Sequence, residues 1–174
     1  GLGSTQARKR FEYEAEILAR LQHPHIAQVY EAGAWCPAEA GRRAVPYFAM
    51  EYVPEARGLM EYVRDEGLSL RSRLGLFLQA CEAIHYGHQK GVIHRDVKPA
   101  NILVDGEGRV KVIDFGVARC TNADLAVTTQ RTEVGQLIGT VQYMSPEQFD
   151  GDAGEVDTRS DVYALGVVLY ELVC

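Results

Sequence analysis

His94-Arg95-Asp96-Val97-Lys98-Pro99-Ala100-Asn101 is the most informative stretch of the chain, together with Asp114-Phe115-Gly116 further along. Two runs of alternating apolar residues, 102–104 and 109–113, lie between these segments and flank the polar turn 105–108. This pattern is typical of a β-hairpin. Because a hairpin returns the chain to the end at which it started, we expect Asn101 and Asp114 to lie within reach of one another.

The two segments resemble the catalytic loop and the metal-binding loop of the protein kinases, and Lys98-Pro99 is similar to the serine/threonine branch. The resemblance implies transfer of the ATP γ-phosphate, with Mg²⁺, to a serine or threonine hydroxyl of a protein. It assigns Asp96 to orienting that hydroxyl and accepting its proton, and Lys98 to stabilising charge. Asn101 and Asp114 would hold the metal, which prefers such oxygen ligands. For each residue alone a solvated or capping role is the better interpretation, but the set favours catalysis.

The composition is that of an ordinary globular protein, with 47% hydrophobic and 24% charged residues among 174. A formal charge of −6 without a basic run argues against a nucleic-acid surface. The apolar stretch 162–174 is too short to span a bilayer and contains Glu171. The four cysteines are too dispersed for a zinc site or a disulfide framework: Cys36, Cys81, Cys120 and Cys174. We expect a reducing, cytoplasmic setting, with membrane attachment of a longer parent protein left open.

The segment 11–26 resembles the regulatory helix of the kinase small lobe and the loop that follows it. In this resemblance Glu14 is the glutamate that pairs with the strand lysine holding the ATP phosphates; the alternative is a plain surface charge. The family's glycine-rich loop and strand lysine would precede Glu14 by more residues than the sequence provides. Lys9 lies on the same predicted helix and cannot replace that lysine. The resemblance therefore implies a chain that begins after the first three strands.

Residues 26–34 and 45–53 are predicted to be strands. The resemblance places Met50 at the back of the adenine pocket and residues 51–53 in the hinge between the lobes. Glu51 and Val53 would contact adenine through backbone groups, and Leu103 would form the apolar floor beneath it. For Met50, a buried strand position is the alternative, and the two interpretations are compatible.

Two helices are predicted next, over 59–64 and from a cap at Ser69 to about Lys90, with Gly91 at the end. We interpret His85 and His88 as packing or capping residues, because no partner recurs at metal-site spacing. The apolar face of the longer helix is expected to be core: Leu70, Leu74, Phe77, Leu78, Cys81, Ile84 and His88. The resemblance also implies a stacked spine that links the lobes: Leu18, Val29, His94 and Phe115.

Residues 114–147 are polar and threonine-rich, and they end in Ser145-Pro146-Glu147, which is similar to a kinase activation segment. The resemblance places Thr140 between Asp96 and Lys98, where it would help to seat the substrate hydroxyl. Candidate phosphorylation sites, with Arg95 as the cation for the added phosphate, are Thr128, Thr129 and Thr132. Residues 157–166 resemble the start of the central helix, in which Asp161 would accept hydrogen bonds from the catalytic-loop backbone. Glu147 would lack its family arginine partner.

The resemblance implies an α+β fold of the two-lobe protein-kinase type, incomplete at both ends. Residues 1–53 would form part of the small lobe and 54–174 part of the large lobe. We expect a central piece of a bacterial-type serine/threonine protein kinase, with little or no activity as an isolated polypeptide. One alternative is a small-molecule kinase of the aminoglycoside or choline type, which Lys98, Asp-Phe-Gly and Ser-Pro-Glu argue against. Another is a non-catalytic, pseudokinase-like binding module, which intact Asp96, Asn101 and Asp114 argue against.

Overall fold

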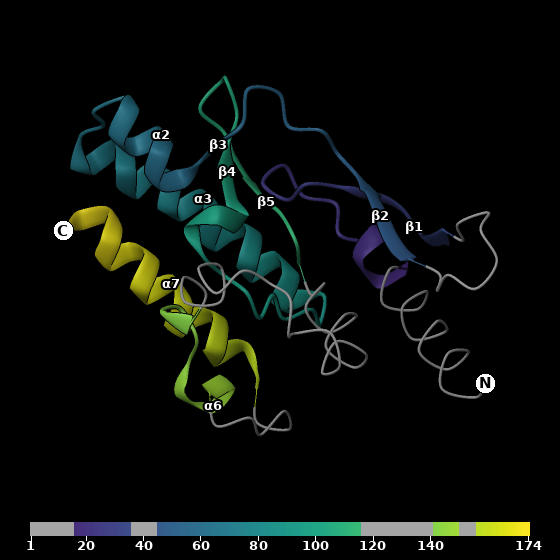
Figure 1. Cartoon of the computed structure of the whole chain (residues 1–174). Coiled ribbons are helices and arrows are strands. Elements are labelled where there is room, and N and C mark those ends of the chain that lie inside the picture. The colour runs from purple at the N-terminus through teal and green to yellow at the C-terminus, as the bar shows by residue number, and fades with distance from the viewer. Residues whose placement is uncertain (1–15, 36–44, 116–140, 150–155) are drawn as a thin grey trace.

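The computed structural model describes residues 16–35, 45–115, 141–149 and 156–174. Helices and strands are mixed, and the strands form two antiparallel sheets, as the predicted α+β class requires. The sheet of Val29–Trp35 and Val45–Met50 lies on one side, while the helices Leu59–Asp65, Leu70–Gln89 and Thr158–Val173 gather on the opposite side (Figure 1). The elements are β1 (Val29–Trp35), β2 (Val45–Met50), β3 (Arg57–Gly58), α2 (Leu59–Asp65), α3 (Leu70–Gln89), the 3₁₀ turn η1 (Pro99–Asn101), β4 (Ile102–Val104), β5 (Val110–Val112), α6 (Pro146–Phe149) and α7 (Thr158–Val173).

Strands β1 and β2 form a two-stranded sheet in which Val29 lies opposite Met50. Both strands were predicted, but β1 begins three residues later than expected. The preceding residues bond to β5 instead: the Ala27 N–H donates to the Val112 carbonyl at 2.9 Å, and the Val112 N–H donates to the His25 carbonyl at 2.9 Å. This pairing ties the small sheet to the second one.

The second sheet has the order β3-β4-β5, and the predicted hairpin is its β4–β5 pair. The turn is stabilised by the buried Asp105 carboxylate, which accepts hydrogen bonds from the backbone N–H groups of Glu107 and Arg109, each at 2.9 Å. Gly108 has a φ of 79°, a backbone conformation that glycine adopts readily because it has no Cβ atom. Local turn chemistry thus sets the register that brings the two ends of the hairpin together.

Helix α3 begins where the sequence predicted, and the Ser69 hydroxyl accepts a hydrogen bond from the Ser72 N–H at 3.2 Å. The predicted core face was partly wrong, because Leu70, Leu74 and Leu78 are exposed. Smaller residues occupy most of the buried face, since close neighbours pack against it. The buried residues of α3 are Leu76, Ala80, Ala83, Ile84 and Gly87.

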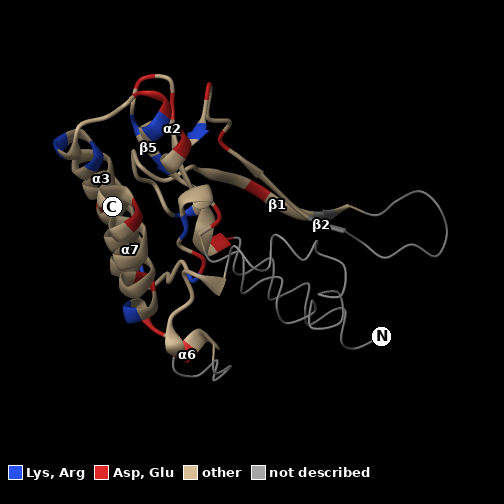
Figure 2. Ribbon diagram, turned by 60° about the vertical axis from the view of Figure 1, so that its left-hand side comes forward, with Lys and Arg blue, Asp and Glu red and all other residues tan. Residues whose placement is uncertain are grey.

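Helix α7 lies antiparallel beside α3. The Arg73 guanidinium near the start of α3 donates to the Leu172 carbonyl at 3.0 Å, near the end of α7. At the other end, His88 contacts Asp161. Charged residues are sparse along the middle of both helices (Figure 2). Apolar residues of α7 therefore join the main core: Ala164, Leu165, Val168 and Leu172.

Of the predicted N-terminal helix, residues 16–19 are helical, and the earlier part lies outside the described residues. Within the described ranges, no helix combines the length and the apolar character needed to cross a membrane.

Candidate active site

The segment that includes His94, Arg95 and Asp96 lies between α3 and η1 in the chain. Its backbone is held by hydrogen bonds to a residue of α7. The buried Asp161 carboxylate accepts hydrogen bonds from the N–H groups of His94 and Arg95, both at 2.8 Å. Its Oδ2 also lies 2.7 Å from Nε2 of His88. The predicted role of Asp161 is confirmed, and His88 contributes a partner that the sequence did not indicate.

Arg95 adopts a φ of 69°, in the left-handed region that costs a non-glycine residue about 1–2 kcal/mol. The two hydrogen bonds that Asp161 accepts from the His94 and Arg95 N–H groups therefore hold a disfavoured backbone in place immediately before Asp96. Such strain is typical of residues whose position matters for chemistry.

The Asp96 side chain receives two donors on the same oxygen. Lys98 Nζ lies 2.8 Å from Asp96 Oδ2, and the Asn101 amide donates to that oxygen at 3.0 Å and to the Asp96 carbonyl at 2.8 Å. Among the described residues, none donates to the other oxygen, Oδ1. The arrangement fixes the carboxylate while leaving one oxygen able to accept a hydrogen bond from a substrate.

The hairpin places Asn101 beside the metal-binding segment, as predicted. The Asn101 carbonyl accepts a hydrogen bond from the Ile113 N–H at 3.0 Å, so Asp114 is the next residue along from this contact. Asp114 also has a left-handed φ, of 60°. Asn101 and Asp114 are thus held near one another by backbone structure.

These two residues suit a magnesium ion in their chemistry. The Asn101 NH₂ group is engaged by Asp96, which leaves its amide oxygen for another partner. The Asp114 carboxylate makes no hydrogen bond or ion pair with any other described residue. No group of three or more His, Cys, Asp or Glu capable of holding a metal occurs in the described ranges. A pair of oxygen donors of this kind fits Mg²⁺, which usually keeps waters and phosphate oxygens as its remaining ligands.

His94 links the two segments through its buried ring. Its Nδ1 accepts from the Asp96 N–H at 3.3 Å, and its Nε2 is 3.0 Å from the Ile113 carbonyl, to which it donates. Burial lowers the pKa of His94, which keeps the ring neutral and able to make both contacts. The Phe115 ring packs against it, with 4.6 Å between centroids.

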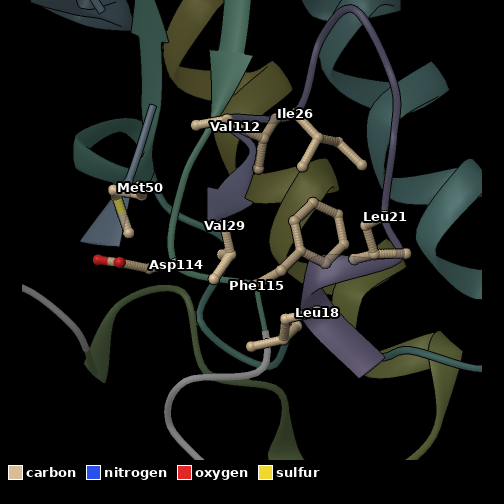
Figure 3. A pocket seen from close by; sticks show the side chains of 9 residues that line it. Leu18, Leu21, Ile26, Val29, Met50, Val112, Asp114 and Phe115 are labelled. Carbon is tan, nitrogen blue, oxygen red and sulfur yellow. The ribbon is translucent and has the colours of Figure 1, made fainter. Parts of the chain in front are cut away.

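Phe115 and Asp114 point to opposite sides of the backbone (Figure 3). Phe115 faces Leu18 and Leu21, whereas Asp114 extends on the side of Met50. Val29 lines the same apolar pocket, which at about 10 Å³ has room for about one water molecule. The structure therefore brings the predicted spine residues Leu18, Val29, Phe115 and His94 into one packed region.

The predicted adenine-binding residues lie on or near the connection 51–56, which joins the two sheets. Met50 lines the pocket with Asp114, Val53 is buried, and Leu103 is half-buried on β4. The Glu51 side chain pairs with Lys111 on β5, at 2.7 Å. No sequence pattern indicated this contact, because the two residues are distant along the chain and the predicted hinge role concerns backbone groups.

Three further contacts were missed by sequence reasoning. Tyr143 donates to both oxygens of Glu171 at 2.9 Å. The Gln148 amide donates to the Arg95 carbonyl at 2.8 Å. Glu147, expected to lack a salt bridge, accepts a hydrogen bond from the Ser160 hydroxyl at 2.5 Å, which lowers its pKa.

Several predicted residues lie outside the described ranges. They are Glu14, Thr140 and the candidate phosphorylation sites Thr128, Thr129 and Thr132. Their roles remain predictions from the resemblance.

Comparison with known proteins agrees with this geometry. The model of the protein kinase domain family matches residues 3–174. The chain is 46% identical over 164 residues to the serine/threonine-protein kinases PknB of Mycobacterium leprae and Mycobacterium tuberculosis, and 45% identical over 164 residues to that of Mycolicibacterium smegmatis. Each alignment covers 94% of the chain, which spans about a quarter (25%) of these relatives' length. With the catalytic-loop and metal-loop residues in place, the chain belongs to the protein kinase domain family.

Proposed function

We propose that the protein is a serine/threonine protein kinase that transfers the γ-phosphate of ATP to a protein hydroxyl. The observation that carries this proposal is the environment of Asp96: Lys98 and Asn101 both bind Oδ2, and the described residues leave Oδ1 without a donor. A carboxylate held in this way can orient a hydroxyl and accept its proton. The names of the relatives support protein serine and threonine as acceptors.

The remaining roles follow from position. Lys98 places a positive charge beside the attacking group, where negative charge moves during transfer. Asn101 and Asp114 would hold Mg²⁺, which when bound neutralises phosphate charge. Met50, Val53 and Leu103 would surround the adenine, with the backbone of 51–53 as its hydrogen-bonding partner. By the resemblance, Glu14 would pair with the lysine that holds the ATP phosphates. Thr140 would help to seat the substrate hydroxyl.

We further propose that residues 1–53 and 54–174 belong to the small and large lobes. The two sheets and the crossing at 51–56 support this division. The protein would act in the cytoplasm or at its membrane boundary, where ATP is available. Acidic and basic residues are interspersed along the ribbon in Figure 2. This mixture supports a protein rather than a nucleic-acid partner.

The test is an acceptor survey with the full-length protein, labelled ATP and Mg²⁺. Acceptors are a mixed protein substrate and a panel of small alcohols, including aminoglycosides and choline. We expect label on serine and threonine of proteins, identified by phosphoamino-acid analysis. Label on a small alcohol alone would support the small-molecule kinase, and nucleotide binding without any transfer would support the non-catalytic module.

The isolated 174-residue polypeptide is expected to transfer little phosphate, because Glu14 has no strand lysine before it in this sequence. Robust turnover by that polypeptide, abolished by Asp96→Asn, would show this expectation to be wrong.

A further inference from the structure

Gln148, on α6, joins two parts of the site that are far apart in sequence. Its Oε1 accepts hydrogen bonds from the backbone N–H and the hydroxyl of Ser145, each at 3.1 Å. Its Nε2 donates to the Arg95 carbonyl at 2.8 Å. One side chain thus connects the segment at 141–149 to the residue that precedes Asp96.

The contacts to Ser145 have a simple structural explanation. Ser145 precedes the first turn of α6, and Gln148 occupies the position from which a side chain reaches back to the cap N–H. This is one half of a capping box, the half in which glutamate would serve as well as glutamine because only an acceptor is needed. The donated bond to Arg95 is an addition that capping does not require.

The Arg95 carbonyl and the Asp96 N–H belong to the same peptide group. Gln148 binds the carbonyl, and His94 Nδ1 accepts from the N–H at 3.3 Å. The preceding peptide is held by Asp161, which accepts from the Arg95 N–H at 2.8 Å. The plane of the peptide that leads into Asp96 is therefore fixed at both of its polar groups, beside a residue whose φ of 69° is disfavoured.

We propose that Gln148 is a positioning residue that fixes the Arg95–Asp96 peptide and so links the segment around Ser145 to the orientation of the Asp96 carboxylate. This inference rests on the proposed function for its effect on rate. A glutamine is suited to the role because its amide accepts from Ser145 and donates to Arg95 at the same time. A carboxylate supplies only the first of these contacts.

The test separates the two contacts in the full-length protein. Gln148→Glu keeps the capping acceptor but loses the donor to Arg95, and Gln148→Met loses both. Gln142→Glu adds the same charge at an exposed glutamine of the same segment and serves as the control. For Gln148→Glu at pH 8 we expect kcat to fall about tenfold, with KM for ATP and the melting temperature unchanged, because one hydrogen bond that orients Asp96 is lost.

The pH profile gives a second, independent signature. When the carboxyl introduced by Gln148→Glu is protonated, it can donate to the Arg95 carbonyl again. Because a glutamate carboxyl ordinarily has a pKa of about 4.3, the kcat of this variant relative to wild type should rise as pH falls from 8 toward about 4.5, whereas that of Gln148→Met should stay low. Wild-type kcat in both variants, or a melting temperature that falls in step with kcat, would overturn the positioning role.

Hydrogen exchange measures the same peptide without relying on catalysis. We expect Gln148→Glu to speed exchange of the Arg95 and Asp96 amides at least about fivefold, with the Gln148 and Phe149 amides unchanged. Unchanged exchange at Arg95 and Asp96 would refute the inference whether or not the enzyme is active. A wild-type protein without transferase activity would refute the proposed function, and exchange alone would then decide whether Gln148 fixes this peptide.

Discussion

Glu51, at the crossing between the two sheets, forms an ion pair with Lys111 on β5, with 2.7 Å between Oε1 and Nζ. A second oxygen of Glu51 accepts from the Gln28 N–H at 3.1 Å. Burial opposes the ionisation of Glu51, but the contacts from Lys111 and Gln28 outweigh it and lower the pKa of the carboxyl. The pair therefore ties the proposed hinge to the hairpin that carries Asp114.

A double-mutant cycle with Glu51→Gln and Lys111→Met should reveal a coupling of about 1–2 kcal/mol in the free energy of unfolding, measured by urea denaturation at pH 7. Because the folded-state pKa of Glu51 is lowered, this contribution is present above the ordinary value of 4.5 and is lost as pH falls through the lowered pKa. The matched control is the exposed pair Arg20–Glu16, which is equally short at 2.6 Å. Its coupling should not exceed about 0.5 kcal/mol; equal couplings for the two pairs would contradict this account.

His94 should make the fold sensitive to mild acid. Its lowered pKa means that the unfolded chain binds a proton more readily, so stability declines as pH falls below the ordinary value of 6.5. His94→Phe should cost about 1–3 kcal/mol at pH 8, because the Asp96 N–H and the Ile113 carbonyl lose a partner. The stability gap between variant and wild type should narrow from pH 8 to pH 5.5 in urea titrations. A gap that stays constant with pH would show that protonation of His94 does not oppose folding.

Gly87 leaves room for the Phe115 ring, which a Cβ atom at this position of α3 would overlap. Gly87→Ala should therefore lower the melting temperature and displace Phe115, although glycine to alanine inside a helix normally stabilises by about 1 kcal/mol. Gly75, on the same helix, has no atom near its hypothetical Cβ, and Gly75→Ala should stabilise. Calorimetry measures the melting temperature of both variants. Stabilisation by both substitutions would contradict this prediction, because it would mean that the Phe115 ring moves aside without loss of stability.

The Tyr143–Glu171 contact should anchor the segment before α6 to α7. Burial and the hydrogen bond to Glu171 raise the pKa of Tyr143 to about 12. Because the neutral phenol is favoured in the fold, this contribution is complete below the ordinary value of 10 and is lost as pH rises toward 12.

Tyr143→Phe should lower the free energy of unfolding by about 1.5–3 kcal/mol at pH 7, the range for a hydrogen bond to a charged group. Tyr163→Phe, at an exposed position of α7, should change it by less than about 0.5 kcal/mol. Urea titrations of the two variants make the comparison, and equal effects would mean that the Tyr143 hydroxyl adds nothing to stability.

Local patterns predicted much of this fold. The Ser69 cap and the hairpin around 105–108 appear where local residue patterns placed them, and the helix that begins at 158 appears where the kinase resemblance placed it. The cap and the hairpin depend on residues close together in the chain, so composition and spacing suffice for them. The roles of Asp96, Lys98 and Asn101 were predicted from the resemblance of one short loop to the kinase catalytic loop, which requires no knowledge of long-range contacts.

Long-range packing explains the failures. The leucines at 70, 74 and 78 follow helical spacing but are exposed, while Ala80, Ala83 and Gly87 are buried. Periodicity identifies an apolar face without showing which face the tertiary neighbours cover. The contacts of Gln148 with Arg95 and of Glu51 with Lys111 likewise join residues whose proximity only the folded chain creates.

The most direct test of the central claim is the single-turnover rate of phosphate transfer in the full-length protein, with Asp96→Asn compared with Asp65→Asn on α2. The amide at position 96 keeps the size of the carboxylate but cannot accept the hydroxyl proton. Asp96→Asn should slow transfer at least about 100-fold with ATP affinity unchanged, and Asp65→Asn should be close to wild type. Transfer by Asp96→Asn within about threefold of wild type would contradict the role of Asp96 as the catalytic base.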